Sequence, residues 1–238
     1  MDDRLPQLDE SLDRIGRWSC FFKGQALHLL LLALCLAVTW AVALPALPGG
    51  EWLGLSARTW LALAIGVPVL HQVVVALSWR AQLCWQVYTR LFGERDTRVW
   101  AVVFLPLLAA RPLVLLGLGL ADTASLQLPY TVSLPLGLVL LVPALYGAYS
   151  VKRWFGIDRA LGGDHFRERY RHMPRVREGA FAWTPNAMYV LVFLGVWAIA
   201  LLTRSQLALA AALFHHAYIH VHLVCTEQPD MDLLYGSD

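Results

Sequence analysis

Residues 25–45 read Gln25-Ala-Leu-His-Leu-Leu-Leu-Leu-Ala-Leu-Cys-Leu-Ala-Val-Thr-Trp-Ala-Val-Ala-Leu-Pro45. This stretch contains no Asp, Glu, Lys or Arg. It is long enough to cross the roughly 30 Å hydrocarbon core of a bilayer, which takes about 20 helical residues. Because lipid offers the backbone no hydrogen-bond partner, such a segment spans a membrane as an α-helix. The stretch therefore predicts a helical membrane protein.

The rest of the chain repeats this pattern. Hydrophobic residues make up 58% of the 238 residues and charged residues 15%, whereas a soluble domain is roughly half apolar and a quarter charged. We expect six membrane spans, at residues 25–45, 59–79, 99–120, 131–151, 186–203 and 206–225. The predicted fold is all-α: a polytopic integral membrane bundle of about six transmembrane helices, forming a single domain over residues 1–238.

Positive charge is distributed unevenly between the predicted connections. The N-terminal segment contains four Lys or Arg residues, the second connection four and the fourth eight, which makes 16. The first and third connections together contain one, Arg58. Because basic residues gather on the cytoplasmic side of membrane proteins, we expect both termini, both basic loops and any site between them on that side. The net charge of +2 is explained by this topology and does not indicate nucleic-acid binding.

Two amphipathic stretches border the predicted spans. Residues 11–24 and residues 80–98 carry apolar side chains beside basic ones. Such stretches either lie in the membrane interface or extend the adjoining spans, and the sequence leaves both interpretations open. Residues 1–24 are therefore predicted to be a cytoplasmic or interfacial N-terminal segment.

One segment looks superficially like a nucleotide-binding turn. Residues 115–122 read Leu115-Leu-Gly-Leu-Gly-Leu-Ala-Asp122. A dinucleotide site needs a helix N-terminus directly after its glycine turn, whereas a loop signal, Thr123-Ala-Ser-Leu-Gln-Leu-Pro129, follows here. We therefore expect Gly117 and Gly119 to let membrane helices approach each other closely.

The second half of the sixth span contains four histidines: His215, His216, His220 and His222. The spacing of His216 and His220 places two possible metal ligands on one helix face. Acidic partners are absent from the spans, however, and only His165 and His172 lie nearby in the sequence. Histidines that face a ligand or a hydrogen-bond partner in a polar cavity are favoured, so we predict no metal site.

Two polar motifs flank the last predicted hairpin. The first is Gly179-Ala-Phe-Ala-Trp-Thr-Pro-Asn-Ala-Met-Tyr189, and the second is Glu227-Gln-Pro-Asp-Met-Asp-Leu-Leu-Tyr-Gly236. Polar residues beside lipid are costly, so they usually serve a ligand or a buried partner. The order and spacing of these motifs resemble the membrane-embedded S-adenosylmethionine methyltransferases. That family includes isoprenylcysteine carboxyl methyltransferases and phospholipid methyltransferases.

The resemblance implies roles for individual residues. The family's first motif begins with a Gly, continues through an Arg-His-Pro-like run and ends with a Tyr, eleven positions in all. The segment from Gly179 to Tyr189 has the same length. Asn186 then stands at the family's His position, where its amide and the Tyr189 phenol would hydrogen-bond the methyl donor. Gly179 would allow a close backbone approach, and Phe181 would form an aromatic wall. Glu227 matches the first Glu of the second motif, a partner for an amino group or ribose hydroxyls.

A histidine also tends to precede the family's Glu motif, and the resemblance implies that His220 or His222 takes that place. Residues 152–238 are accordingly predicted to be the cofactor-binding part. The chain has Pro185 where the family usually has Arg, and Gln228 where it often has a second Glu.

A structural reading of the same motifs remains open beside the functional one. In it, Asn186 caps the fifth helix and Glu227-Gln-Pro-Asp230 ends the sixth. Both readings can hold at once.

Arg111 lies near the middle of the third span, directly before Pro112. No Asp or Glu occurs at a matching depth in any span, and a charge there usually faces a cavity or a partner. One hypothesis is that Arg111 binds a carboxylate or phosphate of the substrate. The other is that it hydrogen-bonds carbonyls freed by Pro112.

These observations predict an integral membrane methyltransferase that uses S-adenosylmethionine, with catalytic roles for Arg111 and Asn186. Its acceptor would be a lipophilic or lipidated molecule that enters from the bilayer, either an isoprenylcysteine-like carboxylate or a phospholipid amine. Two alternatives remain. One is an NADPH-dependent membrane reductase of the sterol-reductase type, and the other is a non-enzymatic lipid-binding or scaffold protein with a degenerate site.

Overall fold

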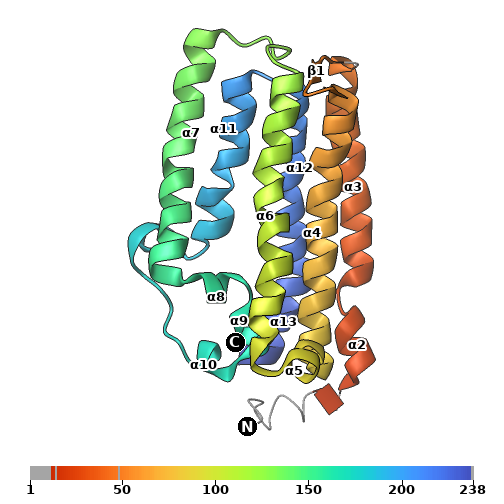
Figure 1. Cartoon of the computed structure of the whole chain (residues 1–238), viewed down its shortest axis with the longest axis vertical. Coiled ribbons are helices and arrows are strands. Elements are labelled where there is room, and N and C mark those ends of the chain that lie inside the picture. Colours follow the sequence, from red (N-terminus) through yellow and green to blue (C-terminus); the bar gives the residue numbers. More distant parts are fainter. Residues whose placement is uncertain (1–11, 14, 48, 237–238) are drawn as a thin grey trace.

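The computed structural model describes residues 12–13, 15–47 and 49–236 (Figure 1). Five helical stretches in these residues are long and apolar enough to cross a membrane: Arg17–Ala46, Ala57–Trp85, Val87–Ala121, Tyr130–Phe155 and Gln206–Tyr235. The predicted all-α membrane fold is confirmed. The fifth predicted span is the exception in length, because the apolar helix at that place, Met188–Thr203, is shorter than the others.

The helices are arranged around α12. The main elements are α2 (Arg17–Phe22), α3 (Gln25–Ala43), α4 (Ala57–Trp85), α5 (Val87–Phe92), α6 (Asp96–Ala121), α7 (Tyr130–Ser150), α11 (Leu194–Thr203), α12 (Gln206–His222) and α13 (Gln228–Tyr235). The short helices α8 (Ile157–Ala160), α9 (Gly163–Phe166) and α10 (Glu168–Arg171) lie in the connection between α7 and α11. Helix α12 contacts α3, α4, α6 and α11, and it runs behind α4 and α6 in Figure 1.

The two ends of the bundle contain different connections. At one end lie the paired strands β1 (Glu51–Trp52) and β2 (Leu55–Ser56) and the connection between α6 and α7 (Figure 1). At the other end lie α2, α5, α10 and α13. The connections that are rich in Arg and Lys therefore share one end, as the charge pattern requires.

Each of the two amphipathic border stretches contains a short helix: α2 lies in the first and α5 in the second, whereas residues 80–85 of the second stretch belong to α4. Helix α2 ends at Phe22, and Gly24 then takes a left-handed conformation with φ 81° before α3 begins. Gln86, with φ 53°, likewise separates α4 from α5. A left-handed residue cannot continue an α-helix, so α2 and α5 are separate from the spans, whereas residues 80–85 extend α4.

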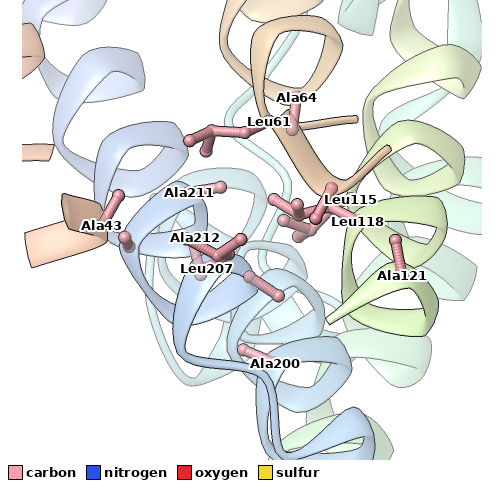
Figure 2. Close-up of a cluster of buried hydrophobic side chains, with 13 residues drawn as sticks. Ala43, Leu61, Ala64, Leu115, Leu118, Ala121, Ala200, Leu207, Ala211 and Ala212 are labelled. Carbon is pink, nitrogen blue, oxygen red and sulfur yellow. The ribbon is translucent and has the colours of Figure 1, made fainter. Parts of the chain in front are cut away.

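Small residues dominate the contact between the helices at the end that holds β1 and β2. Alanines and leucines from five helices form the cluster in Figure 2. The labelled members are Ala43, Leu61, Ala64, Leu115, Leu118, Ala121, Ala200, Leu207, Ala211 and Ala212. A Cβ atom on Gly117 would collide with the Trp60 ring, and one on Gly119 would collide with Thr203. The prediction that these two glycines are close-packing positions is confirmed.

The start of α12 is fixed by a buried carboxylate. Asp122 accepts hydrogen bonds from the Ser205 hydroxyl at 2.7 Å and from the Leu207 N–H at 3.0 Å. The second bond satisfies a backbone donor that a helix N-terminus leaves unpaired, and the first orients the N-cap residue Ser205. They also hold α12 against the end of α6, which sets the position of the residues further along α12.

The last helix does not stop at the second motif. It continues from α12 through the π-helical turn η6 (Leu223–Glu227) into α13. The structural reading in which Glu227-Gln-Pro-Asp230 ends the sixth helix is therefore wrong. Pro229 is the second residue of α13, directly after this π-helical turn.

Candidate active site

The two sequence motifs meet through a hydrogen bond between Tyr189 and Glu227. The Tyr189 hydroxyl donates to a Glu227 carboxylate oxygen across 38 residues of chain. Tyr189 lies in the π-helical turn η5 (Met188–Val192), and Glu227 is the last residue of η6. π-Helical turns are rare and are often found at functional sites. The structure thus joins these two predicted site residues and places each on an irregular helical turn.

Gly179 and Phe181 hold the first motif against the end of α7. Gly179 has φ 60°, and a Cβ atom there would collide with the Trp154 ring. The Ser150 hydroxyl accepts the N–H of the next residue, Ala180, at 3.0 Å. The Phe181 ring stacks on Phe155 with 5.2 Å between centroids. These two predicted site residues therefore fix the path of the chain toward Tyr189.

Asn186 lies on the surface directly before η5. Its backbone carbonyl accepts the Tyr189 N–H at 3.0 Å, and its own N–H donates to the Thr184 hydroxyl at 3.3 Å. Within the described part of the chain, no side-chain hydrogen bond caps this helix, so the predicted Asn186 side-chain cap is not observed. The Asn186 amide is exposed at the edge of the site.

His220 is exposed beside the Tyr189 ring, with 6.5 Å between the ring centroids. Its Nδ1 lies 2.8 Å from the His216 carbonyl oxygen, one helical turn back. The two imidazoles stack at 5.2 Å, and His216 Nδ1 accepts a hydrogen bond from Trp197 Nε1 at 2.8 Å. Across the residues that the structure describes, no three His, Cys, Asp or Glu side chains are grouped to hold a metal ion.

His222 lies on a different face of the same helix. Its side chain is buried, and its ring lies 5.6 Å from Trp79 of α4. The sequence placed His220 and His222 together as candidates for the donor site. The structure separates them, because only His220 stands beside Tyr189.

Arg111 is buried behind the motif site. One guanidinium nitrogen donates to His71 Nδ1 at 3.4 Å, and the guanidinium lies over the Phe193 ring at 5.1 Å. Phe193 directly follows η5, so Arg111 lies beside the turn that holds Tyr189. Its second terminal nitrogen is buried without a hydrogen-bond partner. A buried donor of this kind is costly unless water or a ligand group pairs with it.

A buried charge network beneath the site was not predicted from the sequence. Arg80 of α4 contacts the Asp230 carboxylate at 2.5 Å, and His165 of α9 reaches the same carboxylate at 3.2 Å. Asp164 lies 3.1 Å from the other nitrogen of His165. The Arg80 guanidinium also donates to the Thr226 carbonyl at 3.2 Å. The network ties α4, the α7–α11 connection and α13 together next to Glu227.

The charges of this network determine the protonation of His165. Burial alone would lower the pKa of His165, but the hydrogen bonds and charges of Asp164 and Asp230 outweigh it and raise the pKa to about 9. Burial would raise the pKa of Asp164, but the hydrogen bond and charge of His165 and the hydrogen bond from Tyr235 together outweigh that effect and lower the pKa. His165 is therefore an imidazolium at neutral pH, so both of its ring nitrogens carry protons.

Sequence signals existed for parts of this network. Asp230 belongs to the second motif, and His165 was considered only as a metal ligand. Arg80 was counted as a loop charge, although α4 in fact extends past it to Trp85. Their pairing depends on three segments that lie far apart in the sequence, and nothing in their local patterns indicates it.

The fold and the site thus define a polytopic helical membrane protein with a polar site where two motifs meet. Residues 132–238, which include both motifs, match the family model described as phospholipid methyltransferase. The C-terminal part of the chain is therefore similar to the phospholipid methyltransferases, as the motifs predicted. This match favours that prediction over the reductase alternative.

The chain is also similar to curated phosphatidylethanolamine N-methyltransferases. Those from Candida dubliniensis and Candida albicans are each 31% identical over 74 residues, which is 31% of this chain and 8% of the relative. The one from Komagataella phaffii is 29% identical over 76 residues, 32% of this chain and 8% of the relative. The chain therefore spans only a small part of the length of these relatives. No solved structure matches it significantly.

Proposed function

We propose that this protein transfers a methyl group from S-adenosylmethionine to the amine of a phospholipid. The observation that carries the proposal is the Tyr189–Glu227 hydrogen bond, which joins the two motifs inside the region that matches the phospholipid methyltransferase model. The curated relatives are named for N-methylation of phosphatidylethanolamine. A phospholipid amine is therefore preferred to a carboxylate as the acceptor.

The side chains around Tyr189 fit a donor that carries an ammonium, a carboxylate, a ribose and an adenine. Tyr189 engages one carboxylate oxygen of Glu227, and a carboxylate can accept several further hydrogen bonds from an ammonium or from hydroxyls. Asn186 presents an exposed amide at the edge of the site. When bound, the donor supplies a methyl group that is already activated on a sulfonium.

The remaining task of the protein is to position the two reactants. Correct placement of two reactants accounts for as much as roughly 7–11 kcal/mol of a reaction barrier. Tyr189 and Glu227 are held by their hydrogen bond and by the charge network next to Glu227. The terminal nitrogen of Arg111 that is buried without a hydrogen-bond partner would bind the phosphate of the acceptor. A guanidinium binds phosphate well because it can form parallel hydrogen bonds.

Calorimetric titration of the purified protein with S-adenosylhomocysteine, and separately with NADPH, tests the choice of cofactor. Binding of S-adenosylhomocysteine alone is expected. Binding of NADPH alone would support the reductase, and binding of neither would support a non-enzymatic lipid-binding protein. Methyl transfer to phosphatidylethanolamine, compared with transfer to an isoprenylcysteine carboxylate, then tests the acceptor.

A further inference from the structure

A phospholipid amine presents a chemical requirement that a carboxylate acceptor does not. A primary amine of this kind is largely protonated at neutral pH, and an ammonium has no lone pair with which to attack a methyl group. It must first give its proton to a base. The free amine then forms a nitrogen–carbon bond as the carbon–sulfur bond of the sulfonium breaks, which leaves a methylammonium and a thioether. A carboxylate already has its lone pairs and needs no base.

The charged and titratable groups near Tyr189 differ in their ability to accept a proton. The Glu227 carboxylate already accepts the Tyr189 hydroxyl proton in a hydrogen bond. The Arg111 guanidinium has no lone pair to accept a proton, because arginine stays protonated in proteins. His165 carries protons on both nitrogens at neutral pH, and His222 is buried on another face of α12. Glu227 is only partly exposed, and its remaining lone pairs are assigned to the donor in the proposed function. None of these four groups therefore combines full exposure at the site with a lone pair that is free for the acceptor.

His220 combines both properties. A carbonyl oxygen can only accept a hydrogen bond, so the 2.8 Å contact with the His216 carbonyl requires that His220 Nδ1 carry the proton. In the neutral ring, Nε2 is then left with the lone pair. The side chain is exposed, and its ring lies beside Tyr189. The groups that face it are Tyr189 from η5, which is bonded to Glu227 of η6, and His216 from α12 itself.

We infer that His220 Nε2 is the general base that removes the proton from the acceptor ammonium before methyl transfer. The inference rests on the proposed function, because only an amine acceptor needs this step. It differs from the role that the family resemblance implied, in which His220 binds the donor. The hydrogen bond to the His216 carbonyl fixes both the tautomer and the orientation of the ring, as second partners of catalytic histidines commonly do.

The variant His220→Asn separates these roles. The asparagine Nδ2 keeps a donor near the His216 carbonyl, but the side chain has no basic nitrogen. With phosphatidylethanolamine as acceptor at pH 7, kcat is expected to fall about 100-fold or more, the usual contribution of a general base. The loss should shrink as pH rises and the amine loses its proton to solvent. The dissociation constant of S-adenosylhomocysteine should stay within about twofold of wild type, and imidazole should partly restore a His220→Ala variant.

His172→Asn is the matched control, because His172 is an exposed histidine on the α7–α11 connection, outside the motif site. It should keep the wild-type rate and pH profile. A His220→Asn variant with a wild-type rate and pH profile would overturn the inference while leaving the proposed function intact. A parallel loss of donor affinity would instead make His220 a donor-binding residue. A wild-type protein that binds the donor but methylates only carboxylates would overturn both the inference and the proposed acceptor.

Discussion

The Tyr189 hydroxyl donates a hydrogen bond to the Glu227 carboxylate. This bond joins the motif that precedes the last helical hairpin to the motif that follows it, and the two form one site. Both residues lie on π-helical turns. Each turn inserts an extra residue into the helical repeat, which rotates the side chains that follow it. We therefore attribute the meeting of the two side chains to irregular helix geometry as well as to the helix packing.

Donor binding should depend on both members of this pair. Tyr189→Phe removes the hydroxyl and Glu227→Gln removes the charge, so each should weaken S-adenosylhomocysteine binding about tenfold or more, as loss of a hydrogen bond to a charged group does. Isothermal titration measures the change. Tyr130→Phe is the matched control, since Tyr130 is an exposed tyrosine at the far end of α7. Wild-type affinity in both site variants would show that the donor binds elsewhere.

Arg111→Gln should lower turnover at least tenfold with little change in donor affinity, if the guanidinium holds the acceptor's phosphate. Arg111→Lys should restore activity only in part, because an ammonium does not reproduce a two-pronged contact. Methyl-transfer assays and donor titrations of both variants provide the measurement. Should Arg111→Gln instead lower the melting temperature and keep full activity per folded molecule, Arg111 would be purely structural.

Alkaline pH should weaken the charge network around His165. The pKa of His165 is about 9 in the folded protein and 6.5 in a model peptide. Its contribution to stability is therefore fully present below about pH 6.5 and is lost as pH rises through about 9. The difference corresponds to about 3 kcal/mol. The gap in melting temperature between wild type and His165→Gln should shrink from pH 6 to pH 10, and a gap that does not change with pH would contradict this protonation state.

Side-specific labelling of single introduced cysteines tests the proposed orientation. Arg90 and Arg175 are exposed at the basic end of the bundle, and Glu51 is exposed at the opposite end. Cysteines at positions 90 and 175 should react with an impermeant reagent only from the cytoplasmic side, and a cysteine at position 51 only from the other side. The unmodified protein provides the background, because Cys20, Cys84 and Cys225 are buried. Labelling of position 175 from outside intact cells would reverse the topology.

Composition and charge were sufficient to predict the helical membrane fold, because apolar length and the distribution of basic residues are local properties of the sequence. In the structural reading of the second motif, the Glu-Gln-Pro-Asp run ends the sixth helix, because such a run usually ends a helix. The helix instead continues through the π-helical turn before Gln228 into α13. The Asp230 contacts with Arg80 and His165 join three distant segments, and no pattern within one segment predicts them.

The most direct test of the proposed function follows the methyl group itself. The protein, reconstituted into nanodiscs that contain phosphatidylethanolamine, is incubated with S-adenosylmethionine that carries a deuterated methyl group, and the lipids are analysed by mass spectrometry. We predict that the deuterated methyl appears on the lipid nitrogen with the wild-type protein and is strongly reduced with Glu227→Gln. Donor binding without any labelled lipid amine would contradict the proposed reaction.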